Sequence, residues 1–259
     1  MAGLAVAVLV LVAVALGQAG GGRGGPLDAI AKAAEATQSE PGGHALVDVT
    51  ATASGTPEGV TETGSIVFEN SGRARGTVVA RGHTTGRRVK VQVIADGTTS
   101  YTRSDQFGSL PEGRQWMKID LSSAVSGSSL PADGGPADGL KLLEQMDGAE
   151  EIAKEDIRGV ATTHYRGTLP VSDQEVLGVQ VQVSPPRAEV WIDAQGRVRR
   201  MTIVASGSVE GESGSTTTDM TIDFLDFGPV PKIELPNQDE VFDATGQLES
   251  KLRSAAEAP

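Results

Sequence analysis

The chain has 259 residues, long enough to bury the core of one large domain. It contains no Cys, which excludes disulfides, thiolate metal ligands and a thiol nucleophile. The formal net charge of -12 argues against a nucleic-acid partner, because phosphate binding needs clustered Lys and Arg. The three histidines, His44, His83 and His164, share no metal-ligand spacing, so we expect neither a metal nor a cofactor.

Residues 1–17 are predicted to be a signal peptide or an N-terminal anchor. Every residue from Leu4 to Leu16 is Ala, Val or Leu, a run shorter than the roughly 20 residues of a membrane-spanning helix. No Lys or Arg precedes it, which departs from the usual basic start of a signal. A cut before Gln18 would leave a Gly-rich tether at residues 18–25. We therefore expect an exported protein of the cell envelope or the exterior.

The next part of the chain predicts one helix followed by strands. Proline at the start and Asp28 in the first turn favour a helix over Pro26–Gln38. The apolar period then changes to two, and Asp96-Gly97 is a strong hairpin signal. The strands are expected at Ala45–Ala53, Gly64–Glu69, Gly76–Arg81, Arg88–Ala95, Thr98–Arg103 and Gln115–Leu121.

A Ser- and Gly-rich loop is predicted at Ser122–Gly139, before a second helix at about Asp138–Met146. Strands resume after this helix, so residues 26–236 are predicted to form one domain, with a tail at residues 237–259. The later strands are expected at Gly159–Leu169, Val179–Val183, Ala188–Asp193, Arg197–Ser206 and Thr216–Phe227.

Several apolar side chains are predicted to share one side of the sheet. Antiparallel strands usually bury one face, and the second helix carries an apolar stripe that must pack on that face or on a ligand. Methionine suits surfaces that accept irregular apolar partners, although for any single Met ordinary core packing is the more common explanation. The candidate cavity-lining residues are Met117, Ile119, Leu140, Leu143, Met146, Met201, Ile203, Met220, Ile222 and Phe224.

Short motifs in this order resemble a known family. They are Gln115–Leu121, the Leu-rich helix, Gly159–Tyr165, Val190–Asp193 and Gly196–Met201. Together they are similar to the LolA-like superfamily of envelope carriers, which includes the actinobacterial LppX and LprG lipoproteins. The order of motifs covers most of the chain after Gly25.

The resemblance implies an α+β fold, a curved antiparallel half-barrel with a few helices covering the concave face. It also implies an apolar cavity between the layers that holds a lipid or acyl chain, at a membrane or in the cell envelope, in a protein expected to be a monomer. Trp116 and Trp191 are expected at the cavity rim. Gln18 stands where the lipid-bearing Cys of such lipoproteins would be, so attachment by a lipid is not expected.

Two alternatives remain open from the sequence. An enzyme could use the carboxylates Glu150, Glu151, Glu155 and Asp156 or the pair His164 and Tyr165. However, a run of charged residues is usually a solvated segment, and no nucleophile accompanies the histidine and tyrosine. We therefore predict that the protein is not an enzyme. An interaction or sensor module with a dry core would use the same strands and bind a protein through its outer face or edges.

Overall fold

The computed structural model describes residues 25–69, 71–120, 122, 136–170, 174–176, 179–209, 214–248 and 250. The apolar run at residues 4–16, the tether up to residue 24, most of the Ser- and Gly-rich loop and the last nine residues lie outside the described residues. The strands are β1 (Gly42–Ala53), β2 (Gly59–Glu69), β3 (Arg73–Gly82), β4 (Arg88–Asp96), β5 (Thr99–Arg103), β6 (Trp116–Asp120), β7 (Asp147–Ile157), β8 (Val160–Thr168), β9 (Gln174–Val176), β10 (Val179–Asp193), β11 (Val198–Val209), β12 (Thr216–Phe227) and β13 (Val241–Asp243).

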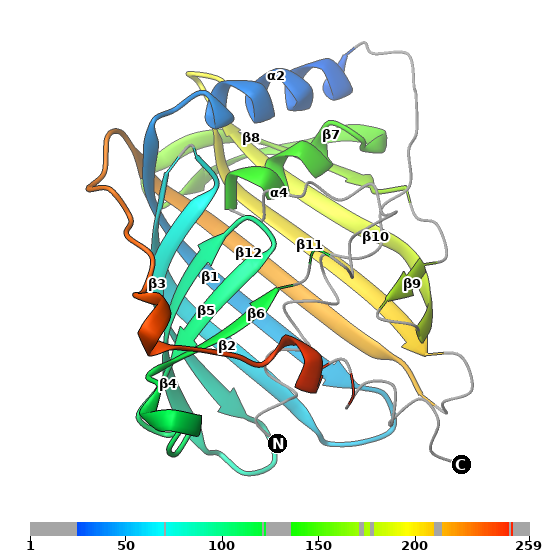
Figure 1. Ribbon diagram of the computed structural model, residues 1–259. Helices are drawn as coiled ribbons and strands as arrows, with labels where there is room; N and C mark the ends of the chain where they lie inside the picture. Colours follow the sequence, from blue (N-terminus) through cyan, green and yellow to red (C-terminus); the bar gives the residue numbers. More distant parts are fainter. Residues whose placement is uncertain are drawn as a thin grey trace.

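These strands form a single open sheet. Its order is β13-β6-β5-β4-β3-β2-β1-β12-β11-β10-β8-β7, with β9 paired to β10. All pairs are antiparallel except β13 with β6, which is parallel. The sheet curls, so that β5 and β6 lie in front of the central strands in Figure 1. The fold is therefore the curved half-barrel that the resemblance implied.

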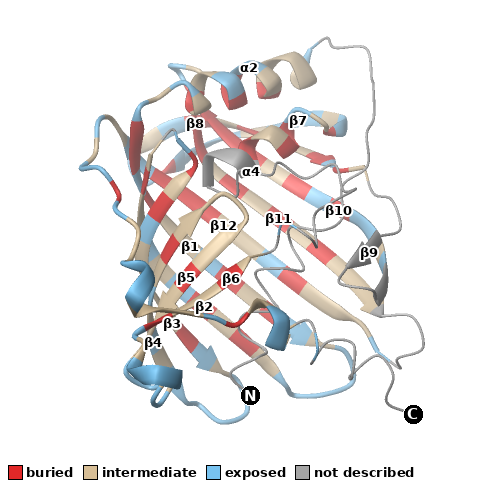
Figure 2. Cartoon of the chain, in the orientation of Figure 1, coloured by how far each residue is buried: buried red, intermediate tan, exposed pale blue. Residues whose placement is uncertain are grey.

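Two helices pack inside the curl, on what we call the inner face of the sheet (Figure 1). They are α2 (Pro26–Gln38) and α4 (Pro136–Leu143); α2 packs on α4 and on β7, β10 and β11. The core between helices and sheet includes Ile30, Leu140 and Leu143, each at most 1% exposed, and the T-shaped pair Phe68 and Phe224 with ring centroids 5.7 Å apart. Figure 2 shows buried residues alternating with less buried ones along the strands behind these helices.

Two glycines allow neighbouring strands to approach closely where the sheet bends. A Cβ on Gly64 in β2 would lie 2.6 Å from the carbonyl oxygen of Thr77, and one on Gly76 in β3 would lie 2.3 Å from that of Ser65. Real Cβ atoms do not come this close to backbone oxygens, so only glycine fits. Glycine at such positions is a common means of bending a sheet.

Most predicted elements are confirmed, with small shifts at their ends. The first helix has the predicted bounds, and the Asp96-Gly97 hairpin joins β4 to β5 with Gly97 at φ 59°. The runs predicted at Val179–Val183 and Ala188–Asp193 are one strand, β10. Pro185 and Pro186 lie at its register shift, where their missing N–H groups are tolerated.

Three strands were not predicted. The charged segment expected to be solvated is β7, an edge strand paired only with β8. An edge strand needs no alternation of apolar residues, because most of its side chains stay in water, and charges on it protect the sheet from unwanted pairing. The short strand β9 was also missed, and β13 forms within the segment expected to be a tail.

Candidate ligand-binding face

The inner face is apolar over most strands of the sheet. One row of residues in register runs over eight strands, and its members share the inner face because they are directly paired. From β8 to β4 this row is Tyr165, Val190, Met201, Ile222, Val47, Gly64, Val78 and Val91.

The structure brings eight of the ten predicted lining residues together. Seven belong to the buried core under the helices, and Met220 packs against it: Leu140, Leu143, Met146, Met201, Ile203, Ile222, Phe224 and Met220. Met117 and Ile119 share the inner face but lie on β6, near the other end of the sheet. Under the helices these side chains pack tightly against each other, so the role of the set as a ligand lining stays a prediction.

Away from the helices, the inner face keeps apolar side chains that are only half-buried. On β3 and β4 these are Val78, Val89, Val91 and Val93, and on β6 Met117 is half-buried too. Their neighbours on the same strands but opposite face, such as Lys90 and Gln92, are exposed. The surface that could still take an apolar partner is therefore this part of the sheet.

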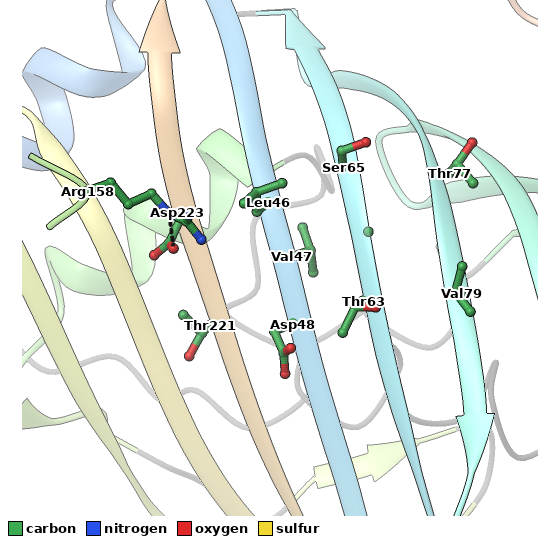
Figure 3. Close-up of a pocket in the computed structure, with 11 residues that line it drawn as sticks. Leu46, Val47, Asp48, Thr63, Ser65, Thr77, Val79, Arg158, Thr221 and Asp223 are labelled. Carbon is green, nitrogen blue, oxygen red and sulfur yellow. Dashed lines mark hydrogen bonds and ion pairs between the residues drawn. The ribbon is translucent and has the colours of Figure 1, made fainter. Parts of the chain in front are cut away.

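A hollow in the described structure lies on the other side of the sheet, which we call the outer face. It has a volume of about 450 Å³ and is open to solvent. Figure 3 shows Asp48, Thr63 and Thr221 on three neighbouring strands around it, with Arg158 reaching over to Asp223. Another hollow, between β10, β11 and β12, measures about 10 Å³, roughly the room needed for one water molecule.

Neither tryptophan lies on the inner face. Trp191 is paired with His164 on β8 and Arg200 on β11, and the row continues to Asp223, all on the outer face. Trp116 packs in a separate cluster with Ile94, Tyr101 and Ile233. The strand registers that place Met117 inside turn Trp116 outward, because neighbouring residues of a strand face opposite ways.

His164 is the centre of a polar cluster on the outer face. Its ring stacks on Trp191 at 4.1 Å between centroids, and its side chain is 6% exposed. Its Nδ1 lies 3.2 Å from Glu155 Oε1 and its Nε2 lies 3.0 Å from Glu189 Oε2. Trp191 Nε1 donates to Glu155 Oε2 at 3.0 Å. The bond from Trp191, and then the one from His164, hold the pKa of Glu155 below its usual range, although Glu155 is open to water.

Asp223 extends this outer cluster toward the hollow. It is 4% exposed and accepts hydrogen bonds from Arg158 Nε and Arg200 Nη2, each at 2.8 Å. Burial alone would raise the pKa of Asp223, but the bonds from Arg200 and Arg158 outweigh it and hold the pKa below its usual range. His164, Glu155 and Asp223 are thus bound in ion pairs and hydrogen bonds that stabilise the sheet.

The sequence reasoning missed one residue of the inner face, Glu62 on β2. It is 6% exposed and lies between Val49 of β1 and Ala80 of β3. Burial raises its pKa from 4.5 to about 7. The signal was available, because Glu62 has the same strand parity as Val60, which is also buried.

In the part of the chain that the structure describes, no group of three or more His, Cys, Asp or Glu side chains is placed to hold a metal ion. None of its helices combines the length and the apolar character that crossing a bilayer requires.

The fold and this face define a class: an α+β half-barrel with an aliphatic inner face partly covered by helices. No family model matches the chain. It is 22% identical over 227 residues to an uncharacterized 31.2 kDa protein in the rplA-rplJ intergenic region of Streptomyces griseus, covering 72% of each chain.

Two solved structures are similar in fold. One is lipoprotein LppX from Mycobacterium tuberculosis, 13% identical, with 80% of this chain and 97% of that chain covered and a TM-score of 0.47. The other is LprF from Mycobacterium bovis, 16% identical, with 82% and 96% covered and a TM-score of 0.42.

Proposed function

We propose that this protein binds the hydrocarbon part of a lipid or similar apolar molecule on the inner face of its sheet, and that it does so as an exported, non-enzymatic protein of the cell envelope. The observation that carries the proposal is the half-buried aliphatic surface on β3, β4 and β6. Transfer of hydrocarbon from water contributes about 0.8 kcal/mol for each buried CH₂, so a long chain lying along these valines gains substantial affinity.

The curved shape supports the same function. A flat sheet exposes an apolar face to solvent, whereas a curled sheet surrounds a bound chain with strands on several sides. Most small-ligand sites are concave and apolar. Under α2 and α4 the side chains already fill the space, so the proposed site extends from the edge of that core over β3–β6 and differs in place from a cavity directly beneath the helices.

The test compares two substitutions on neighbouring residues of β4. Val91→Glu places a charge on the inner face, and Gln92→Glu places the same charge on the exposed outer face. With an uncharged fluorescent acyl-chain probe, we expect Val91→Glu to weaken binding at least about tenfold, because a carboxylate is costly to bury against hydrocarbon. We expect Gln92→Glu to bind like the parent protein.

Circular dichroism of both variants controls for folding. Equal probe affinity in the two folded variants would show that the ligand does not bind against the inner face of β4. A parent protein that does not bind the probe at all would contradict the proposed function itself.

A further inference from the structure

The inner faces of β1–β4 carry one polar side chain. In the registers of these four strands, every other inward-facing residue is Gly, Ala, Val, Ile or Phe, and Glu62 stands alone among them. Its own row across the sheet contains Gly167, Ala188, Ile203, Met220, Val49, Glu62, Ala80 and Val89.

No hydrogen bond or ion pair joins Glu62 to any residue that the structure describes. It is more than nine-tenths buried, and no basic side chain faces it from β1 or β3. Buried carboxyl groups are costly without a partner, and most polar groups in protein interiors have one. The carboxyl of Glu62 therefore has no partner among the described residues and can pair with a group that a ligand brings.

Glu62 also lies near side chains that the proposed function uses. Val89 on β4 is two strands away in the same row, which is about 10 Å at the usual strand spacing. A ligand chain lying along Val89, Val91 and Val78 would end within reach of the carboxyl group.

We propose that Glu62 is the polar anchor of the inner face and selects an amphiphile with a basic nitrogen. The ammonium group of this ligand pairs with the Glu62 carboxylate, and its hydrocarbon chain lies along the neighbouring valines. This inference rests on the proposed function and names the class of ligand. An ammonium supplies the opposite charge and N–H donors that the site lacks, and charge-assisted hydrogen bonds are the stronger ones. An anionic head group would instead be repelled.

The ionisation of Glu62 adds a pH dependence to this selection. With a pKa of about 7 in the free protein, the carboxyl is charged above neutral pH and neutral below it. The groups facing it from β1 and β3 are Val47, Val49, Ala51, Val78 and Ala80, none of which titrates. The preference for an amine is therefore expected to weaken as the pH falls.

The experiment is competition against the uncharged acyl-chain probe by dodecylamine, dodecanol and dodecanoic acid, each kept below the concentration at which it aggregates or separates from solution. At about pH 8.5 we expect dodecylamine to bind about 10 to 100 times more tightly than dodecanol, in line with hydrogen bonds to charged groups. The preference should disappear in Glu62→Gln and Glu62→Leu and persist in Glu58→Gln, which removes an exposed carboxylate just before β2. At about pH 5.5 the preference of the parent protein should shrink.

Equal affinity for amine and alcohol in the parent protein would overturn the inference and leave the proposed function standing. An amine preference that survives in Glu62→Gln would do the same. If the probe itself does not bind to the parent protein, both the proposed function and this inference are contradicted.

Discussion

At the scale of the residue, Glu62 shows how position alone changes the chemistry of a side chain. Glu58 is exposed at the turn before β2, and Glu62 is buried on the inner face four residues later. Burial in aliphatic surroundings disfavours the charged form, so the pKa of Glu62 is raised from 4.5 to about 7. The same residue type thus acts as a solubilising charge in one place and as a neutral acid near pH 6 in the other.

This difference predicts a measurable dependence of stability on pH. Between pH 4.5 and 7 the folded chain holds a proton on Glu62 that the unfolded chain has released, so this group's contribution to the free energy of unfolding falls as the pH rises through that window. The fall amounts to roughly 3 kcal/mol, at 1.36 kcal/mol for each pKa unit.

Glu62→Gln removes this titration. We expect the variant to be more stable than the parent protein at about pH 8, with the advantage shrinking toward about pH 5, as measured by urea unfolding. Glu58→Gln is the matched control and should follow the parent curve. A constant difference between Glu62→Gln and the parent across this range would contradict a raised pKa at Glu62.

At the scale of the element, a single buried hydroxyl ties α2 to the sheet. Thr37 is 1% exposed; its Oγ1 donates to the carbonyl of Ala33 at 2.7 Å and accepts from the N–H of Val198 at 2.8 Å. Val198 is the first residue of β11, so this bond sets where the end of the helix meets the sheet. The apolar face of α2 alone would not fix the position of the helix along the sheet, because hydrophobic contact is not directional.

Thr37→Val is nearly the same size but cannot accept the hydrogen bond. We expect it to lower the free energy of unfolding by about 1 to 3 kcal/mol, because the N–H of Val198 is then buried without a partner. Thr37→Ser keeps the hydroxyl and should cost less, through the lost methyl group alone. Chemical denaturation of the three proteins checks the order, and equal losses in Val and Ser would show that the hydroxyl has no such role.

At the scale of the whole molecule, one continuous sheet has two differently covered parts. Over β10–β12 the inner face is packed against α2 and α4, while over β3, β4 and β6 the described inner face keeps half-buried valines and a methionine. Since the strands form one hydrogen-bonded path, the two parts share a backbone frame but differ in how much apolar surface each buries.

Hydrogen exchange should separate these two parts. We expect amides of β10–β12 to exchange more slowly than those of β4–β6, because local opening costs more where more apolar surface is packed. Adding the acyl-chain probe should slow exchange mainly in β3–β6. Added protection confined to β10–β12 would instead place the ligand beneath the helices, and no change anywhere would argue against binding.

The alternation of the sequence was sufficient for most of the strands, whereas the half-barrel class came from the resemblance of its motifs to a known family. Alternation was also sufficient to place Met201, Ile203, Met220 and Ile222 on one face, because side chains alternate strictly along a strand. The same rule could have found Glu62, which shares its parity with Val60. The edge strand β7 was not predictable in this way, since its backbone pairs on one side only and its side chains follow no apolar period.

By itself, the sequence determined which residues share a face, where the helices and most turns lie, and that cysteine chemistry is excluded. Only the tertiary structure decided which parts of that face are packed and which stay half-open, and that Glu62 has no partner among the described residues. The physical reason is that alternation is a local property of each strand, whereas burial and pairing depend on which distant segments the curled sheet brings together.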